Sequence, residues 1–319
     1  MQTLPLVDTE LRPMVAGAPR FVLNDAKLAR ARSDTVTFFD TLGEPNTAPR
    51  VLRVPGRRGD PEVELRVHGV REGETKPALF MIHGGGFVMG TAGMRDGLDG
   101  DLANETGAIV VAVDYRLAPE TAFPGALHDC YAALEWLFAN AAELGADPDR
   151  IFILGESGGG GLGAALALLA RDRSEITPAG QMLIYPMLDH RTGTAEEPRP
   201  NPSTGEFAWT RENNRFGWES MLGGQALFGD ALGYFSPSTA LRLDGLPPAF
   251  IAVGALDLFM EEDVDYAARL SRAGVGVELH VYPGAIHGFD IIGDTGLARQ
   301  FRADRLAALH RWFAKPPVA

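Results

Sequence analysis

The sequence contains little cysteine, few basic residues and no long hydrophobic run. Its 319 residues include a single cysteine, Cys130, so no internal disulfide can form, which favours a reducing compartment such as the cytoplasm. The 29 Lys and Arg residues are outnumbered by 42 Asp and Glu residues, giving a formal charge of −13. That charge disfavours binding to nucleic acids and to anionic membranes, because both are themselves negatively charged.

Signals for membrane insertion, export and metal binding are missing as well. Every apolar stretch is interrupted by charges or turn formers well before the roughly 18 residues that a membrane span needs. Residues 1–10 lack a basic start followed by an apolar run, so no signal peptide is visible and we expect a cytoplasmic protein. The sequence contains neither an HxxxH nor a CxxC pair, so we expect no metal.

What the sequence does contain is an alternation of short apolar segments and helical segments. Residues 51–54 and 63–70 look like an antiparallel strand pair at an edge. The later apolar segments, predicted as buried strands, are 78–83, 108–113, 151–154, 182–185, 249–253 and 277–281. The predicted helices are 23–42, 124–144, the segment after Ser157, 261–273 and 296–313. This alternation predicts a mostly parallel sheet covered by helices on both faces.

One stretch breaks this rhythm. Between residues 187 and 235 the chain has no clear core strand and offers two amphipathic pieces, 210–221 and 224–232. Long excursions from a compact sheet usually carry function, so we interpret this stretch as a cap over the site, joined by the N-terminal helix. The alternative is a peripheral insertion without a catalytic role. The expected organisation is an N-terminal cap segment 1–47, core parts 48–187 and 236–319, and a cap insertion 188–235.

The most informative motif is a serine between glycines at the end of a predicted strand. Residues 151–159 read IFILGESGG, and a small-residue helix follows. This Gly-x-Ser-x-Gly pattern predicts a sharp strand-to-helix turn with Ser157 at its apex in a positive-φ conformation. Gly158, Gly160 and Gly163 also match a dinucleotide-binding spacing, but Ser157 already occupies the turn. We therefore expect a nucleophilic Ser157 and no cofactor.

A serine nucleophile needs a base and a group that orients the base. His287 follows the last predicted strand, at the carboxyl end where open α/β sheets place their sites. Asp257 follows the strand before it. The chain order is therefore Ser, Asp, His, as in hydrolases whose nucleophile stands on a Gly-x-Ser-x-Gly turn. The neighbouring acids Glu261, Glu262 and Asp263 are alternatives; they lie at the start of a predicted helix, where acids stabilise the positive end of the dipole.

The oxyanion of such a reaction needs backbone N–H donors. Residues 83–87 read HGGGF directly after a buried strand, and glycines let the backbone approach a substrate closely. The residue after the nucleophile, Gly158, would supply a further donor. We expect His83 to hold the loop by hydrogen bonding rather than to act as a base, with Gly84 as part of the same loop.

Together these motifs resemble those of the hormone-sensitive-lipase-like bacterial esterases, a family of α/β-hydrolases. The resemblance rests on HGGG at 83–86, DYRLAPE at 114–120, the serine turn, the Asp257 loop and the His287 loop. It implies an α/β-hydrolase fold with an eight-stranded sheet and a helical cap, no cofactor, and Gly85 and Gly86 as oxyanion donors. It departs from the family at Gly158, where alanine is common, and after Asp257, where the family often has Pro-Leu. Many members are dimers, so a homodimer is one assembly that the resemblance allows.

The sequence therefore predicts a serine carboxylesterase acting on small-molecule esters with short to medium acyl chains. An amidase or acyltransferase using the same residues, and a non-catalytic ligand receptor on this scaffold, are the alternatives. A receptor would typically have lost the base, whereas Ser157, Asp257 and His287 are all present. The residues expected to shape an apolar pocket are Phe87, Val88, Met89, Tyr185, Phe207, Trp209, Phe216 and Trp218.

Overall fold

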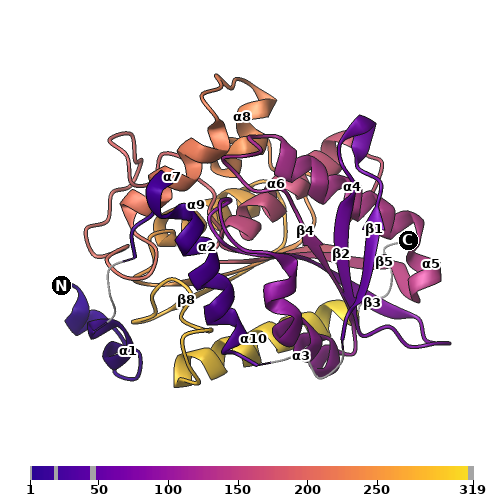
Figure 1. Cartoon of the computed structure of the whole chain (residues 1–319), viewed down its shortest axis with the longest axis horizontal. Helices are drawn as coiled ribbons and strands as arrows, with labels where there is room; N and C mark the ends of the chain where they lie inside the picture. The colour runs from indigo at the N-terminus through magenta and orange to yellow at the C-terminus, as the bar shows by residue number, and fades with distance from the viewer. Residues whose placement is uncertain (1, 18–20, 44–47, 315–319) are drawn as a thin grey trace.

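The computed structural model describes residues 2–17, 21–43 and 48–314, in which helices cover both faces of a central sheet (Figure 1). The sheet has eight strands in the order β1-β2-β4-β3-β5-β6-β7-β8. The strands are β1 Arg50–Val54, β2 Val63–His68, β3 Lys76–Ile82, β4 Ile109–Asp114, β5 Ala146–Glu156, β6 Gly180–Ile184, β7 Ala249–Gly254 and β8 Val277–Tyr282. Strand β2 runs antiparallel to both of its neighbours and all other pairs are parallel, which confirms the predicted fold class.

The helices largely follow the predicted pattern. They are α1 Arg12–Ala16, α2 Asp25–Asp40, α3 Asp96–Thr106, α4 Gly125–Ala139, α5 Ala141–Leu144, α6 Gly158–Arg173, α7 Arg211–Leu222, α8 Asp230–Phe235, α9 Met260–Arg272 and α10 Gly296–Phe313, with short 3₁₀ turns η1 Leu4–Leu6, η2 Arg57–Gly59, η3 Ala92–Arg95 and η4 Pro237–Thr239. The prediction of one continuous helix over 124–144 is wrong. The chain leaves helical geometry at Asn140, whose φ is −114° and whose side chain donates back to the carbonyl of Trp136 at 2.8 Å.

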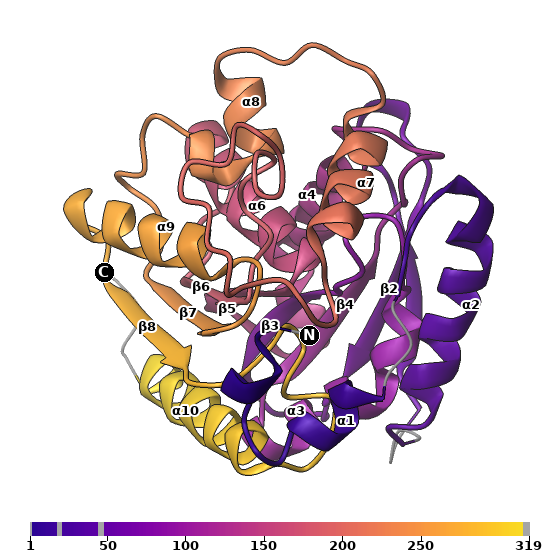
Figure 2. The same ribbon diagram turned by 90° about the vertical axis from the view of Figure 1, so that its left-hand side faces the viewer.

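Alternate side chains of the central strands enter two separate cores. In β3, Phe80 and Ile82 pack in the core beneath α4, α6 and α9, whereas Leu79 and Met81 pack in the core shared with α3 and α10. Figure 2 shows α10 and α3 on one side of the sheet and α4, α6 and α9 on the other. Because both faces are buried, the strands read as continuous apolar runs in the sequence.

An N-terminal helix is tied to the loops at the carboxyl ends of the strands. Arg32 of α2 makes two hydrogen bonds to the carboxylate of Glu120, at 2.8 and 2.7 Å. Its Nε also donates to the carbonyl of Val88 at 2.8 Å. These charge-assisted bonds hold α2 beside the loops that follow β3 and β4, and thus beside the edge of the sheet where a site is expected.

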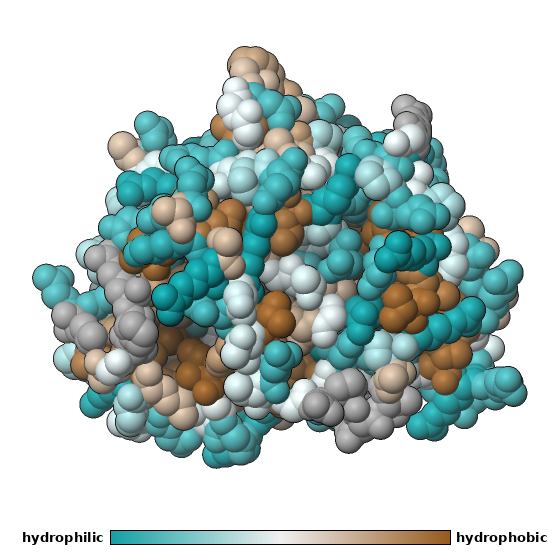
Figure 3. All heavy atoms as spheres, in the orientation of Figure 1, coloured by the Kyte–Doolittle hydropathy of each residue, from teal (hydrophilic) through white to brown (hydrophobic). Residues whose placement is uncertain are grey.

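The surface is mostly polar on the face that Figure 3 shows, where hydrophobic residues are exposed in separate places. Two of the most exposed large hydrophobic residues flank α8 in the chain: Phe228 is 80% exposed and Leu241 is 94% exposed. In the described part of the chain, none of the helices combines the length and apolar character needed to cross a membrane.

Candidate active site

Ser157 lies on a sharp turn between β5 and α6. Its φ of 55° and ψ of −121° confirm the predicted positive-φ conformation. Its N–H donates to the carbonyl of Ile184 at 2.9 Å, which fixes the turn to the neighbouring strand β6. A Cβ added to Gly159 would lie 2.2 Å from the carbonyl oxygen of Ile82, so only glycine fits where the turn crosses β3.

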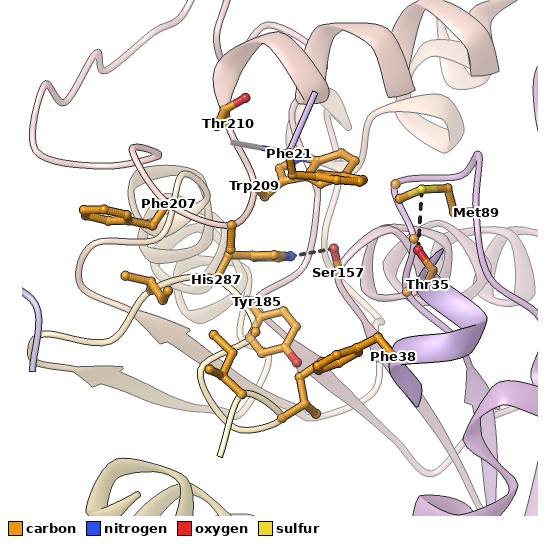
Figure 4. A pocket seen from close by; sticks show the side chains of 18 of the residues that line it. Phe21, Thr35, Phe38, Met89, Ser157, Tyr185, Phe207, Trp209, Thr210 and His287 are labelled. Atoms are coloured by element: carbon orange, nitrogen blue, oxygen red, sulfur yellow. Dashed lines mark hydrogen bonds between the residues drawn. The ribbon is translucent and has the colours of Figure 1, made fainter. Parts of the chain in front are cut away.

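The structure brings Ser157, His287 and Asp257 together. Ser157 Oγ lies 2.9 Å from His287 Nε2, as Figure 4 shows, and His287 Nδ1 lies 2.8 Å from Asp257 Oδ2. Asp257 follows β7 and His287 follows β8, so all three residues stand at the carboxyl edge of the sheet. Asp257 is completely buried, and its Oδ1 accepts the N–H of Phe259 at 3.0 Å, which fixes the carboxylate against the imidazole.

The alternative acids lie in the first turn of α9, as the sequence predicts. Glu262 is turned towards the segment after β6, where its Oε1 accepts the N–H groups of Leu188 and Asp189 at 2.6 and 3.1 Å. Asp263 is fully buried, and within the described residues neither of its carboxyl oxygens has a hydrogen-bond partner. Burial, followed by the charges of Glu262 and Asp257, raises the pKa of Asp263 well above its usual value.

The glycine loop after β3 approaches the start of α6. The carbonyl of Gly85 accepts the N–H groups of Val88 and Met89, and among the described residues no backbone hydrogen bond uses the N–H groups of Gly85 or Gly86. A Cβ added to Gly158 would lie 3.0 Å from the backbone nitrogen of Gly86, so glycine at this position lets loop and helix come close. As the first residue of α6, Gly158 also has an N–H without an intrahelical partner.

His83 is buried beneath this loop. Its Nδ1 donates to the carbonyl of Gly84 at 2.8 Å, and its ring stacks on Tyr115 with a centroid distance of 4.2 Å. The Tyr115 hydroxyl donates in turn to the carbonyl of His83 at 2.9 Å. Burial lowers the pKa of His83 to about 4, so its imidazole is neutral near pH 7. These contacts hold the loop in place and leave His83 unsuited to act as a cation.

A cavity of about 930 Å³ opens around Ser157 and His287. Of the residues expected to shape it, Met89, Tyr185, Phe207 and Trp209 do line it. Figure 4 shows Trp209 and Tyr185 on opposite sides of the His287 ring, with Phe207 and Met89 further out on either side. The walls are therefore largely apolar, with the serine and the histidine as polar groups at the centre.

The expectation that Phe87 and Val88 line this cavity is wrong. Both are buried, and Phe87 has a φ of 69° and packs edge-on against Trp218 at a centroid distance of 4.9 Å. Trp218 itself belongs to the core, and Phe216 packs against that core. The left-handed turn at Phe87 directs its side chain inwards, which the residue type alone does not reveal.

Several residues that line the cavity are not among those predicted from the sequence. They come from α1, from α2 and from the segment between them, and include Met14, Val15, Phe21, Thr35 and Phe38. One signal in the sequence points to part of this wall: the predicted N-terminal helix carries two adjacent phenylalanines, Phe38 and Phe39, and both line the cavity.

Comparison with known proteins places this architecture in one family. Residues 79–291 match a family model described as an alpha/beta hydrolase fold. The chain is 36% identical over 305 residues to the carboxylesterase NlhH of Mycobacterium tuberculosis, with 89% of each protein covered. It is 35% identical over 217 residues to an ethyl acetate hydrolase of Pseudomonas putida, covering 68% of this chain and 67% of that protein.

Solved structures agree with these relationships. A bacterial heroin esterase superposes with a TM-score of 0.88 at 37% identity, covering 98% of this chain and 100% of the other. An esterase of Pyrobaculum calidifontis superposes with a TM-score of 0.83 at 31% identity, covering 96% and 98%. The chain therefore belongs to the hormone-sensitive-lipase-like carboxylesterases of the α/β-hydrolase superfamily, enzymes that hydrolyse carboxylic esters.

Proposed function

We propose that this enzyme hydrolyses esters through an acyl-enzyme on Ser157. His287 takes the proton from Ser157 as Oγ attacks the ester carbonyl, and Asp257 holds the imidazole and stabilises its cation. His287 then protonates the leaving alcohol and activates the water that releases the acid. The observation that carries this proposal is the continuous chain of contacts from Ser157 Oγ to His287 at 2.9 Å and from His287 to Asp257 at 2.8 Å.

The proposed oxyanion donors are the N–H groups of Gly85, Gly86 and Gly158. Two observations support them: the glycine loop after β3 and the first residue of α6 lie within close contact of each other, and both border the cavity or the serine. N–H groups placed where negative charge develops stabilise the transition state, and each is worth about 10²–10³ in rate.

We propose short- to medium-chain carboxylic esters as substrates, bound beneath a cap formed by residues 1–47 and 188–235. Parts of both segments line the cavity, among them Phe38 from the first and Phe207 and Trp209 from the second. The predominantly apolar wall suits an acyl chain or an aromatic alcohol. The similarity to an ethyl acetate hydrolase supports small esters in particular.

Turnover of a matched series of substrates tests this function. p-Nitrophenyl esters from acetate to octanoate, and the p-nitroanilide with the best acyl group, would be assayed on the wild type and on Ser157→Ala. We expect ester turnover to exceed amide turnover strongly, and Ser157→Ala to lower kcat by about 10⁶-fold with an unchanged circular-dichroism spectrum. Amide turnover equal to ester turnover, or a fully active Ser157→Ala variant, would contradict the proposal.

A further inference from the structure

The residue before the nucleophile, Glu156, carries a buried carboxylate that the proposed mechanism does not use. It is the last residue of β5, and its side chain is 7% exposed. Side chains alternate along a strand, so Glu156 shares a face with Leu154, which packs in the core with α3 and α10. Glu156 therefore points away from the helix that follows Ser157 and towards α3.

On that face the carboxylate meets Arg95, the last residue of η3. Arg95 Nη1 lies 2.5 Å from Glu156 Oε2, and Arg95 Nε lies 3.2 Å from Asp99 Oδ1, one turn further along in α3. The side chain of Arg95 is 3% exposed and that of Asp99 is completely buried. Burial lowers the pKa of Arg95, but the charges of Glu156 and Asp99 raise it more, so the guanidinium stays protonated. Losing one member of such a group leaves a buried charge without a partner.

The same buried region extends beneath His287. The Tyr185 hydroxyl donates to Asp290 Oδ1 at 2.9 Å, and the Tyr185 ring lies 4.7 Å from the His287 ring. Asp290 belongs to the His287 loop, and burial followed by the charge of Glu156 raises its pKa to about 6. Glu156 pairs across the sheet with Ile184, the residue before Tyr185, so the contacts that support Ser157 and those that support His287 are neighbours.

We propose that Arg95 is a positioning residue for Ser157, acting through Glu156. Asp99 fixes the guanidinium to α3, and the guanidinium fixes Glu156, the last residue of β5. The contact therefore restrains the backbone directly before the strained Ser157. This inference rests on the proposed function, because it needs Ser157 to be the nucleophile. A backbone held outside its preferred conformation persists only when its surroundings determine it, and small displacements of a reacting group cost up to about 10²-fold in rate.

A double-mutant cycle tests the proposal. Glu156→Gln, Arg95→Met and the double variant would be compared for kcat and KM on p-nitrophenyl butyrate and for the rate at which an aryl fluorophosphonate labels the serine. We expect each single substitution to lower kcat and the labelling rate about 10- to 100-fold, with KM nearly unchanged. The double variant should be no slower than the slower single variant, because both changes remove the same interaction. Arg95→Lys should recover part of the rate.

Arg66→Met is the matched control. Arg66 binds Asp96, also in α3, with an Nε–Oδ1 distance of 2.8 Å, and in the described part of the chain neither residue forms a hydrogen bond or ion pair with Glu156. We expect this variant to lose stability without losing kcat. The proposal would be overturned if Arg66→Met lost as much kcat as the Arg95 and Glu156 variants. It would also be overturned if the losses of kcat in the two single variants multiplied in the double variant, or if the single variants kept kcat and showed only a lower melting temperature.

Two features keep the test decisive. If Arg95→Met does not fold, Glu156→Gln still retains the Arg95–Asp99 pair, and its kcat and labelling rate decide the outcome. A wild type that reacts with the fluorophosphonate but hydrolyses no ester would contradict the proposed function alone. The labelling rates of the variants would still measure how well Ser157 is positioned.

Discussion

At the scale of single residues, the reactivity of Ser157 depends on its backbone. Conformations such as its φ of 55° cost about 1–3 kcal/mol and need support from their surroundings. The N–H of Ser157 donates to the carbonyl of Ile184 at 2.9 Å. The carbonyl of Ser157 accepts the N–H groups of Gly161 and Met187 at 3.0 Å each. The turn therefore holds Oγ towards His287 without relying on contacts of the serine side chain alone.

The first prediction concerns Asp257. Asp257→Asn should lower kcat by about 10⁴-fold while the fold is retained, because an amide cannot stabilise the imidazolium and allows the wrong tautomer of His287. The measurement is kcat on p-nitrophenyl acetate at neutral pH. Glu261→Gln is the matched control from the neighbouring helix turn and should leave kcat unchanged, since Glu261 binds Asn201 instead of His287. A loss of less than about tenfold in Asp257→Asn would mean that another group orients the base.

At the scale of elements, α9 joins the Asp257 loop to the segment that follows β6. Its first turn places Glu262 on the backbone of residues 188 and 189, and buries Asp263 without a partner among the described residues. Two N–H donors thus satisfy the carboxylate of Glu262, whereas the carboxyl oxygens of Asp263 have no hydrogen-bond donor among the described residues. Isolated buried carboxyls destabilise a fold once they ionise.

The prediction for this element is a pH-dependent gain in stability in Asp263→Asn. An acid whose pKa is raised by folding keeps its proton longer in the folded state, so the free energy of unfolding falls as the pH rises above the unfolded pKa of 3.8 towards the folded value. Asparagine does not ionise, so the free energy of unfolding of the variant, relative to that of the wild type, should increase as the pH rises. Urea midpoints at about pH 5 and about pH 8 measure this. A difference between the two proteins that is the same at both pH values would contradict the assignment.

At the scale of the whole molecule, the sheet and the position of the site were predictable, whereas the cavity wall was only partly so. Continuous apolar segments such as 78–83 identify buried parallel strands, and parallel strands bring Ser157, Asp257 and His287 to one edge of the sheet. The N-terminal wall was not predictable in detail, because Phe38 reaches the cavity only through the way α2 docks on the core. Phe21 lies in the segment before α2, and its backbone carbonyl is bound by Asn213 of α7. The inward turn of Phe87 was likewise invisible, since its φ depends on the packing of the glycine loop.

The central claim is that Ser157 is the group that becomes acylated. Its most direct test is intact-mass spectrometry and peptide mapping after reaction of the wild type with an aryl fluorophosphonate at neutral pH. The account predicts one adduct per chain, on Ser157, because among the described residues only this hydroxyl combines a base at 2.9 Å with the glycine loop beside it. The absence of an adduct, or an adduct on another residue, would contradict it.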